Sequence, residues 1–385
     1  MSKEDTDSNF KVICLTGPCG GKTSGISILS DLFQSLGWRV YRVPETATIL
    51  LNGGVHFPDL DSESVFCFQK SLLSVMLEIE DTYRDLAKLN ATKGIKTVII
   101  CDRGAMDPSA YMPREDWLRV LEDLKLDEVN LRDNRYDCVV HLVTAAKGAE
   151  AFYTLENNAT RTEGIELAMS LDDSIMNAWV GHASLQVIDN ISVPDFTAKC
   201  DRVIQAVSNR LGLTLDQTRF GKAVKKHKFL VKTFVLSDSF PVPYRDFEVE
   251  HAYLVNTSGD GTETRIRRRT EMGTKSVHLN LTTRQPNQNG QRVETRRNLL
   301  PREYDVLKAQ CDPSRKPIHK IRRCFLYKDR YFQLDVYQSP ASGLMLLEGY
   351  LDYDSNGRIL VPDWIECEEV TDNIDYSMYT IAAEK

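Results

Sequence analysis

The sequence predicts an α/β domain with a parallel sheet, followed by a second domain that is mainly antiparallel β. Apolar strands alternate with helical stretches up to about residue 212, and short strands with little helix follow. At 385 residues, the chain is long enough for two separate cores. We expect a flexible N-terminus over 1–9, the first domain over 10–212, a linker over 213–223 and the second domain over 224–385.

In the first domain, continuous apolar runs predict buried strands, and apolar residues at helical spacing predict the connecting helices. This order is typical of a doubly wound α/β fold. The predicted strands are 11–16, 38–43, 96–101, 138–143 and 186–188. The predicted helices are 22–36, 62–89, 114–124, 163–181 and 195–211.

The second domain contains runs with alternating or β-branched residues, which are typical of antiparallel strands. These runs are KFLVKTFVL, FEVEHAYLV, ETRIRRRT, KSVHLNLTTR, CFLYKDRYFQLDVY and LMLLEGYLDY. Only PREYDVLKAQC looks helical among them. We therefore predict an antiparallel sheet or barrel for this half.

Cysteine usage and hydropathy favour a soluble cytoplasmic protein. The nine cysteines are scattered, without a C-x-x-C pair or a Cys/His metal array, which favours reduced thiols. No apolar run approaches the ~20 residues that span a bilayer. The net charge of −7 says little about partners, because local clusters decide binding, and we expect no nucleic-acid partner.

The stretch VICLTGPCGGKTSG places a glycine-rich loop between a predicted strand and a predicted helix. A P-loop has this context, because its backbone N–H groups surround phosphate oxygens at a helix N-terminus while its lysine reaches the β/γ-phosphates. Thr16 replaces the usual leading glycine. The alternative interpretation is a tight turn that happens to carry Lys-Thr. The expected nucleotide-binding residues of the loop are Gly17, Gly20, Gly21, Lys22, Thr23 and Ser24.

Two acidic residues follow predicted strands and are candidates for phosphoryl chemistry. Asp102 could hold Mg²⁺ together with the hydroxyl of Thr23, although an aspartate after a strand is also a preferred helix cap. Glu45 could orient a water or an acceptor hydroxyl, or could be a solvated loop acid. We expect Asp102 and Glu45 to belong to the catalytic set.

Two polar segments complete the predicted nucleotide site. Arg161 precedes a helix in a polar loop, where it could cover the transferred phosphate as a catalytic lid residue or be an ordinary surface arginine. Asp189 and Asn190 end the last apolar strand, where ligands of such sheets bind, and either could contact the base. A turn role for Asp189 is the alternative.

The second domain carries a strand with basic residues on one face. Arg265, Arg267 and Arg269 alternate in ETRIRRRT, so their side chains point to the same side of the strand. Clustered guanidinium groups favour an anion ligand, with an exposed, solvated sheet face as the alternative. The other candidate anion-binding residues are Lys228, Arg284, Lys320 and Arg322.

The motifs LTGPCGGKTS, VPETA, CDRG, RTEG and VIDN occur in an order and spacing that resemble the P-loop kinase group containing the ribosylnicotinamide kinase domain. The resemblance covers about 10–212. It implies that Lys22 and Thr23 are nucleotide and metal ligands, that Asp102 is the strand-end carboxylate and that Arg161 is the lid arginine.

The second half resembles the CYTH, or triphosphate-tunnel, domain over about 222–383, which implies a tunnel-shaped barrel. The matching segments are KKHKFLV, VEHAYLV, RIRRR, HLNLTTR, IHKIRR, FQLDVY, GLMLLEGYLD and WIECEEVT. Metal-holding glutamates of that family are replaced here by Val224, Lys226, Tyr350 and Arg296, whereas Glu294, Glu348 and Glu369 remain. A cavity changed in this way should bind polyanions and hydrolyse them poorly.

The two domains in this order resemble the TRPL translocation defect protein 14 family over nearly the whole chain. The resemblance implies a regulatory protein that binds guanine nucleotide with Mg²⁺, although ATP is open on physical grounds. It also implies phosphoinositide or polyphosphate binding, peripheral contact with endomembranes and a role in membrane trafficking. A small-molecule kinase and a tunnel-type triphosphatase are the alternatives, and slow GTP hydrolysis is compatible with the first function.

Overall fold

The computed structural model describes residues 10–150, 164–213, 225–233, 240–256, 259–286, 292–351 and 359–383. These residues form two compact units. The first unit extends to Arg210, and the second comprises 211–213 and the described residues from 225 onward. Each unit has its own sheet and is described separately.

The first unit contains a five-stranded parallel sheet in the order β2-β3-β1-β4-β5. Its strands are β1 (Phe10–Thr16), β2 (Arg39–Val43), β3 (Thr97–Asp102), β4 (Cys138–Leu142) and β5 (Leu185–Ile188). Its helices are α2 (Lys22–Ser35), α3 (Thr46–Leu51), η1 (Phe57–Asp59), α4 (Ser62–Ala91), η2 (Asp107–Tyr111), α5 (Arg114–Asp123), η3 (Asn130–Asn134), α6 (Ile165–Ala178) and α7 (Phe196–Leu211).

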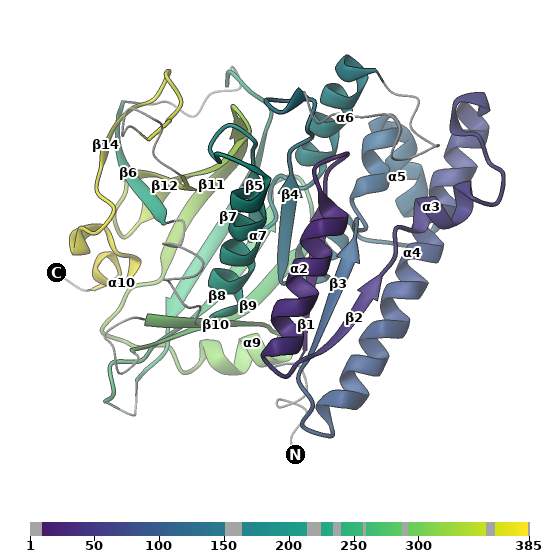
Figure 1. Ribbon diagram of the computed structural model, residues 1–385. Coiled ribbons are helices and arrows are strands. Elements are labelled where there is room, and N and C mark those ends of the chain that lie inside the picture. Colours follow the sequence, from purple (N-terminus) through teal and green to yellow (C-terminus); the bar gives the residue numbers. More distant parts are fainter. Residues whose placement is uncertain are drawn as a thin grey trace. The chain divides into compact units, whose positions relative to one another are not determined.

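The strand register brings three carboxyl ends together in the centre of this sheet. Leu15 pairs with Asp102 of β3, and Thr16 pairs with His141 of β4. Helices α2 and α7 lie beside each other on one face of the sheet, as Figure 1 shows. The loop after β1 therefore begins where ligands of parallel α/β sheets bind.

The core of the first unit forms where apolar strands meet the apolar faces of their helices. β1 and β3 are buried along most of their length, as continuous apolar strands covered on both faces should be. From α2, Leu29 and Phe33 are fully buried, and from α4, Leu73 and Ala87 are fully buried. This packing holds the carboxyl ends of the strands rigidly beneath the loop.

The second unit is a nine-stranded sheet with antiparallel pairings, in the order β10-β9-β8-β7-β11-β12-β13-β6-β14. Its strands are β6 (Lys226–Thr233), β7 (Tyr244–Tyr253), β8 (Glu263–Glu271), β9 (Val277–Pro286), β10 (Arg292–Asn298), β11 (Ile318–Tyr327), β12 (Arg330–Ser339), β13 (Met345–Tyr350) and β14 (Glu366–Glu369). Its helices are α9 (Pro301–Lys308), η5 (Ile374–Tyr376) and α10 (Met378–Ile381).

The sheet of the second unit curls, because side chains from strands far apart in its order interact. Burial lowers the pKa of Lys228 on β6, and the charge of Arg284 on β9 lowers it as well, although five strands separate β9 from β6 in the sheet. Among the described residues, no pairing joins the edge strands β10 and β14. One face of the curved sheet therefore surrounds an interior that holds both cations.

The predicted fold class, a parallel α/β domain followed by a mainly antiparallel β domain, is confirmed. Three details of the prediction were wrong. CFLYKDRYFQLDVY is two strands, because Lys328 and Asp329 adopt positive φ angles of 48° and 54° and form a hairpin turn. Helices α3 and α10 were not predicted, because segments of six and four residues are too short to show helical periodicity. Strand β10, rich in charged residues, was also missed.

No helix within the described ranges is both long and apolar enough to cross a bilayer.

Candidate functional site

The loop between β1 and α2 needs glycine at positions where the backbone approaches β4. Gly17 has a φ of 106°, a left-handed conformation that side chains disfavour. A Cβ atom on either Gly17 or Gly20 would lie 2.2 Å from the carbonyl oxygen of Leu142, which is a severe clash. The loop therefore lies tightly against the end of β4. Helix α2 begins directly after it, with Gly21 as its N-cap and no capping side chain.

Lys22 and Asp102 face each other across the carboxyl edge of the sheet. The Lys22 ammonium donates to the carbonyl oxygen of Gly17 at 2.8 Å and lies 3.7 Å from Asp102 Oδ1. Burial raises the pKa of Asp102, and the charge of Lys22 offsets only part of this effect. Asp102 Oδ1 is buried and accepts no hydrogen bond from the described residues. Asp102 Oδ1 thus lacks a hydrogen-bond donor and has the Lys22 ammonium as a neighbouring cation.

Asp102 and Thr23 fit a hard cation such as Mg²⁺. Asp102 Oδ1, which accepts no hydrogen bond from the described residues, and the hydroxyl of the exposed residue Thr23, in the first turn of α2, are oxygen donors of the kind that Mg²⁺ prefers. Ser24, next along the helix, is half-buried. Thr23 and Ser24 thus lie in the first turn of α2, and Asp102 lies at the end of β3.

Glu45 lies at the start of α3 and is part of an ion cluster. It pairs with Arg103, whose Nη1 lies 3.7 Å from Asp107 Oδ2, and it accepts a hydrogen bond from Thr48 at 2.8 Å. Burial opposes ionisation of Glu45, but Arg103 and Lys22 outweigh it and lower the pKa to about 2. Glu45 is therefore an ionised, oriented carboxylate close to the loop, and a weak proton acceptor.

Asp189 and Asn190 are both engaged in local contacts after β5. Asp189 Oδ1 accepts from the backbone N–H groups of Ile191 and Ser192 at 2.8 and 2.6 Å. The Asn190 amide donates to the carbonyl oxygens of Thr144 and Lys147 at 2.8 and 2.7 Å. These bonds tie the β5 loop to the β4 loop. Contact of either residue with a base stays a prediction.

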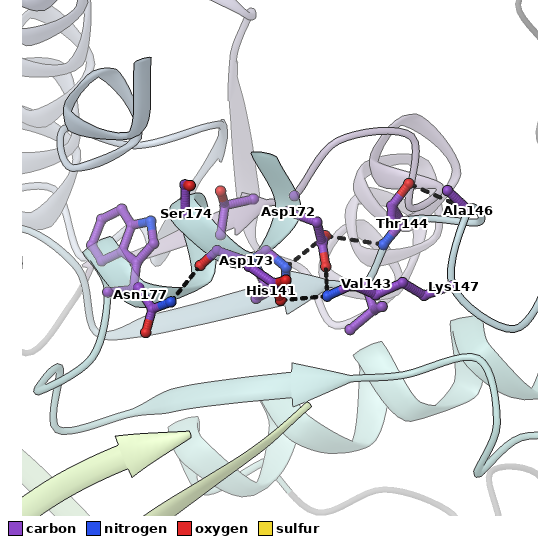
Figure 2. A network of polar contacts seen from close by, with 12 residues as sticks. His141, Val143, Thr144, Ala146, Lys147, Asp172, Asp173, Ser174 and Asn177 are labelled. Carbon is purple, nitrogen blue, oxygen red and sulfur yellow. Dashed lines mark hydrogen bonds and ion pairs between the residues drawn. The ribbon is translucent and has the colours of Figure 1, made fainter. Parts of the chain in front are cut away.

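A buried polar network holds α6 to the end of β4 (Figure 2). Asp172 accepts hydrogen bonds from His141 Nε2 and from the Thr144 N–H, both at 3.0 Å, and pairs with Lys147 at 3.0 Å. Burial opposes ionisation of Asp172, but His141 and Lys147 lower its pKa overall. Helix α6 begins shortly after Arg161 in the sequence. Arg161 itself lies outside the described residues.

In the second unit, the alternating arginines of β8 point into the protein. Arg265, Arg267 and Arg269 are at most 8% exposed, whereas Arg268 between them is exposed. The guanidinium of Arg269 stacks on the Phe247 ring at 3.5 Å. The Nε and Nη1 atoms of Arg265 have no hydrogen-bond partner among the described residues. Burial and the nearby charge of Arg284 both lower its pKa.

Lys320 and Arg322 of β11 share one buried carboxylate. Asp335 accepts from Lys320 Nζ at 2.6 Å and from Arg322 Nε and Nη2 at 2.6 and 2.7 Å. Burial and, to a smaller extent, the charge of Arg322 lower the pKa of Lys320 to about 8, although Asp335 acts in the opposite direction. Two cations on one anion leave an excess of positive charge.

Lys228 and Arg284 also have acidic neighbours on adjacent strands. Lys228 lies 3.7 Å from Glu348 and donates to the carbonyl oxygen of Tyr376 at 2.7 Å. Arg284 donates to Glu294 Oε2 at 2.6 Å. The structure describes all seven predicted anion-binding residues. We define these seven residues and His251 as the basic cluster.

His251 was missed by sequence reasoning, although it lies at the centre of the basic cluster. It is 4% exposed, and neither ring nitrogen has a hydrogen-bond partner within the described ranges. Burial lowers its pKa far below the usual value, and the nearest cations act in the same direction. These cations are Lys320, Arg265, Arg267 and Arg322. A histidine directly before AYLV, at the end of an alternating strand, was the available signal.

The acids of the second unit do not fit a divalent metal site. Glu348 pairs with Lys226 at 2.6 Å and with Arg322 at 3.5 Å, in addition to Lys228. Burial opposes ionisation of Glu294, but Arg296, Arg265 and Arg284 outweigh it and lower its pKa. Glu369 is engaged with His227 at 2.7 Å. These carboxylates are neutralised by the protein's own cations. Val224 lies outside the described residues.

Two further residues of the first unit, Gln69 and Asp107, were also missed. Gln69 is 2% exposed on α4, and Asp107 is 1% exposed at the start of η2. The available signal for Gln69 was a polar residue within an apolar stripe, between Phe66 and Leu73. Asp107 lies five residues after Asp102, in a segment where no periodicity of apolar residues indicates a helix or a strand.

A family model described as the AAA domain matches residues 12–194. This match and the loop geometry identify the first unit as a P-loop-type domain. The matched range begins in β1 and ends just before α7. No curated protein matches the chain.

Several solved structures are similar to parts of the chain. The inorganic triphosphatase NE1496 is 23% identical with a TM-score of 0.30, over 42% of this chain and 98% of that one. A thymidylate kinase from Ehrlichia chaffeensis is 16% identical with a TM-score of 0.33, over 52% and 99%. The PH1819 protein from Pyrococcus horikoshii OT3 is 15% identical with a TM-score of 0.25, over 34% and 80%. Similarities at this level do not transfer a function.

Proposed function

We propose that the first unit binds a nucleoside triphosphate with Mg²⁺. The observation that carries this proposal is the buried Oδ1 of Asp102, which accepts no hydrogen bond from the described residues and lies 3.7 Å from the Lys22 ammonium. An unsatisfied buried carboxylate is unfavourable, and a hydrated cation would satisfy it. The phosphates would lie on the N-terminus of α2, where N–H groups and the helix dipole favour anions.

The test is nucleotide binding by Lys22→Ala, measured by isothermal titration with GTP and with ATP. Loss of a desolvated lysine–phosphate contact should weaken binding by about 2–5 kcal/mol. Lys88→Ala is the control, because Lys88 is an exposed lysine on α4 whose only ion pair among the described residues is with Asp85. Unchanged affinity in Lys22→Ala would overturn the proposal.

We further propose that the second unit binds polyphosphate-type anions, such as a phosphoinositide headgroup, without hydrolysing them. Arg265 supports this, because a buried guanidinium with two unpartnered nitrogens is unfavourable until an anion accepts from it. Around Asp335 and His251, cations outnumber carboxylates, and this excess also favours binding of an anion. Hydrolysis would need a metal, and the paired acids offer it no free ligand set.

The test is binding of tripolyphosphate, and of vesicles containing phosphoinositides, by the full chain in chelator. Arg265→Gln should weaken binding at least tenfold, whereas Arg268→Gln on the exposed side of the same strand should not. Thermal unfolding of both variants checks that the fold is retained. Binding of tripolyphosphate but not of the vesicles would indicate a soluble ligand. Metal-dependent phosphate release would overturn the proposal in favour of a triphosphatase.

A guanine preference and a role in membrane trafficking at endomembranes rest on the whole-chain resemblance to the TRPL translocation defect protein 14 family. In this function, nucleotide occupancy of the first unit regulates anion binding by the second. The matching experiment compares GTP and ATP affinities, and then measures phosphoinositide vesicle binding with each nucleotide. Equal affinities for GTP and ATP, or vesicle binding independent of nucleotide, would contradict this function.

A second candidate function is phosphoryl transfer to a small-molecule acceptor. It is favoured by a cavity that is lined by Lys22 and Glu45, next to the loop. The acceptor hydroxyl oxygen would attack the γ-phosphorus, the bond to the β-phosphate bridging oxygen would break, and the nucleoside diphosphate would leave. Because Glu45 has a low pKa, it would orient the hydroxyl, and the proton would leave with the phosphorylated product or solvent. Incubation with GTP and candidate acceptors, followed by ³¹P NMR, tests this transfer.

A further inference from the structure

His251 of β7 is a buried histidine on the inner face of the second unit's sheet. In the register of the sheet it lies directly opposite Arg267 of β8 and Ile318 of β11. Residues that lie opposite each other on neighbouring strands point their side chains to the same face. Because His251 and Arg267 are both almost fully buried, this face is the interior of the curved sheet. The imidazole therefore lies among the buried arginines of β8.

The largest charge effects on the imidazole all come from cations on two neighbouring strands. These cations are Arg265 and Arg267 of β8 and Lys320 and Arg322 of β11. The acid beside them, Asp335 of β12, lies 2.6 Å from both Lys320 and Arg322. Tyr253 shares the inner face of β7, and burial raises the pKa of its hydroxyl, so it carries no charge at neutral pH. Burial and the four cations hold the pKa of His251 far below its usual value, so the ring is neutral without a ligand.

A bound anion reverses the preference of this ring for the neutral form. Neutral imidazole has one N–H donor and one acceptor nitrogen, whereas imidazolium has two N–H donors. Neither nitrogen of His251 has a hydrogen-bond partner within the described ranges. Phosphate oxygens accept hydrogen bonds, and a negative charge beside the ring favours its protonated form. Arg265, two residues before Arg267 on β8, adds two buried donor atoms without a partner in the described part of the chain, Nε and Nη1.

We propose that His251 binds phosphate oxygens of the anion directly and takes up one proton when the anion binds. This inference rests on the proposed anion-binding function of the second unit, to which it adds a ligand contact and a dependence on pH. In the complex, the ring is protonated at a higher pH than in the free protein. Between these two pH values, the complex holds a proton that the free protein lacks. The affinity therefore rises as the pH falls, by up to about tenfold per pH unit for one proton.

The test is isothermal titration with tripolyphosphate in EDTA at about pH 7.5, 6.5 and 5.5. The parent protein is the full chain with Lys22→Ala, so that the loop between β1 and α2 contributes no phosphate site. The ratio of the parent affinity to the affinity of His251→Gln should rise by at least about fivefold from the highest pH to the lowest. Protonation of tripolyphosphate itself cancels in this ratio. Lys320, with a pKa of about 8, is largely protonated throughout this range.

His319→Gln is the matched control, because His319 is an exposed histidine on β11, and its affinity should equal that of the parent at each pH. Thermal unfolding at each pH checks that both variants are folded. Histidine-selective NMR of the parent needs no substitution at His251. One of the seven histidine rings should stay neutral without tripolyphosphate and become protonated in its presence. This signal should be absent from the spectrum of His251→Gln.

Two results would overturn the inference and leave anion binding by the second unit intact. One is an affinity ratio that does not change with pH, and the other is that no histidine ring changes its protonation when tripolyphosphate binds. Absence of tripolyphosphate binding at every pH is a different outcome, because it would overturn the proposed anion-binding function and the inference together.

Discussion

The hydroxyl of Thr16 donates a hydrogen bond to Asp107 Oδ2 at 2.7 Å, across 91 residues of sequence. Asp107 Oδ1 accepts from the indole N–H of Trp179 at 2.6 Å, so one buried carboxylate joins β1, η2 and the end of α6. Thr16 is therefore the last residue of a strand and not a member of the turn. Gly17 takes the left-handed conformation instead, so the missing leading glycine does not loosen the loop.

Asp107→Ala should destabilise the first unit by roughly 3 kcal/mol. The change would leave the Thr16 hydroxyl and the Trp179 N–H buried without acceptors, and each unsatisfied group costs about 1–3 kcal/mol. Urea unfolding followed by tryptophan fluorescence measures the effect. Asp85→Ala removes only an exposed pair with Lys88, so its loss should stay below about 1 kcal/mol. Equal stabilities of the two variants would contradict the role of Asp107.

The local parts of the nucleotide site could be predicted from sequence, because the loop motif and the strand ends are contiguous patterns. The topology of a parallel sheet then brings Lys22 and Asp102 to one edge. The sequence does not indicate that Glu45 pairs with Arg103, or that Asp107 accepts from Thr16. Such pairings depend on how loops from different strands pack, which no periodicity encodes.

The same limit applies to the second unit. Alternation predicts that Arg265, Arg267 and Arg269 share a face, because it is a property of a single strand. The position of Lys228 beside Arg284 depends instead on how far the whole sheet curls. The cavity beside the loop was missed for a similar reason, since segments that only tertiary packing brings together line it.

Asp102→Asn should make nucleotide affinity nearly independent of magnesium. The neutral amide has a similar shape, but it attracts the hydrated cation poorly, and loss of such a group typically lowers metal affinity by about 10–100-fold. Titration of GTP in Mg²⁺ and in EDTA measures the difference. Asp123→Asn changes an exposed residue paired with Lys70 and should retain the wild-type response. If Asp102→Asn also retains the wild-type response to magnesium, Asp102 has only a helix-capping role.

The first unit should lose stability as the pH falls from about 6.5 to 4, because of His182. Its Nδ1 accepts from the Ser184 N–H at 3.1 Å, and its Nε2 donates to the Tyr136 carbonyl oxygen at 3.1 Å, so the folded state requires the neutral ring. Burial lowers its pKa to about 4. Between these pH values the unfolded chain binds a proton that the folded chain excludes, so unfolding becomes more favourable as the pH falls.

The size of the His182 effect follows from the difference between the two pKa values. About 2.5 pH units at ~1.4 kcal/mol each give a loss of roughly 3 kcal/mol between pH 6.5 and 4. His182→Gln removes the titrating group. The stability of this variant should therefore fall less steeply between pH 6.5 and 4, although the variant is less stable than the wild type at pH 6.5. Urea unfolding at several pH values measures both slopes, and three of the four tryptophans report on this unit. Parallel slopes would exclude His182 as the cause.

Glu348→Gln should raise the affinity of the second unit for tripolyphosphate, by about tenfold. In the folded protein the Glu348 carboxylate pairs with Lys226, Lys228 and Arg322, so it competes with a ligand for these cations. Burial opposes its ionisation, but the same cations lower its pKa well below the usual range, and it therefore carries its charge at neutral pH. Removing this charge leaves the cations to the ligand.

The opposite outcome is expected if Glu348 holds a divalent metal that bridges to the phosphates. In that case Glu348→Gln would weaken binding, and wild-type binding would need Mg²⁺. Titrations in EDTA and in Mg²⁺ therefore distinguish the two arrangements. Glu368→Gln is the matched control, because Glu368 is exposed on β14 and pairs with Lys232 at 3.3 Å. A metal-free anion site requires that Glu348→Gln binds tripolyphosphate more tightly than the wild type and that Glu368→Gln does not. The gain in affinity must also be equal in EDTA and in Mg²⁺.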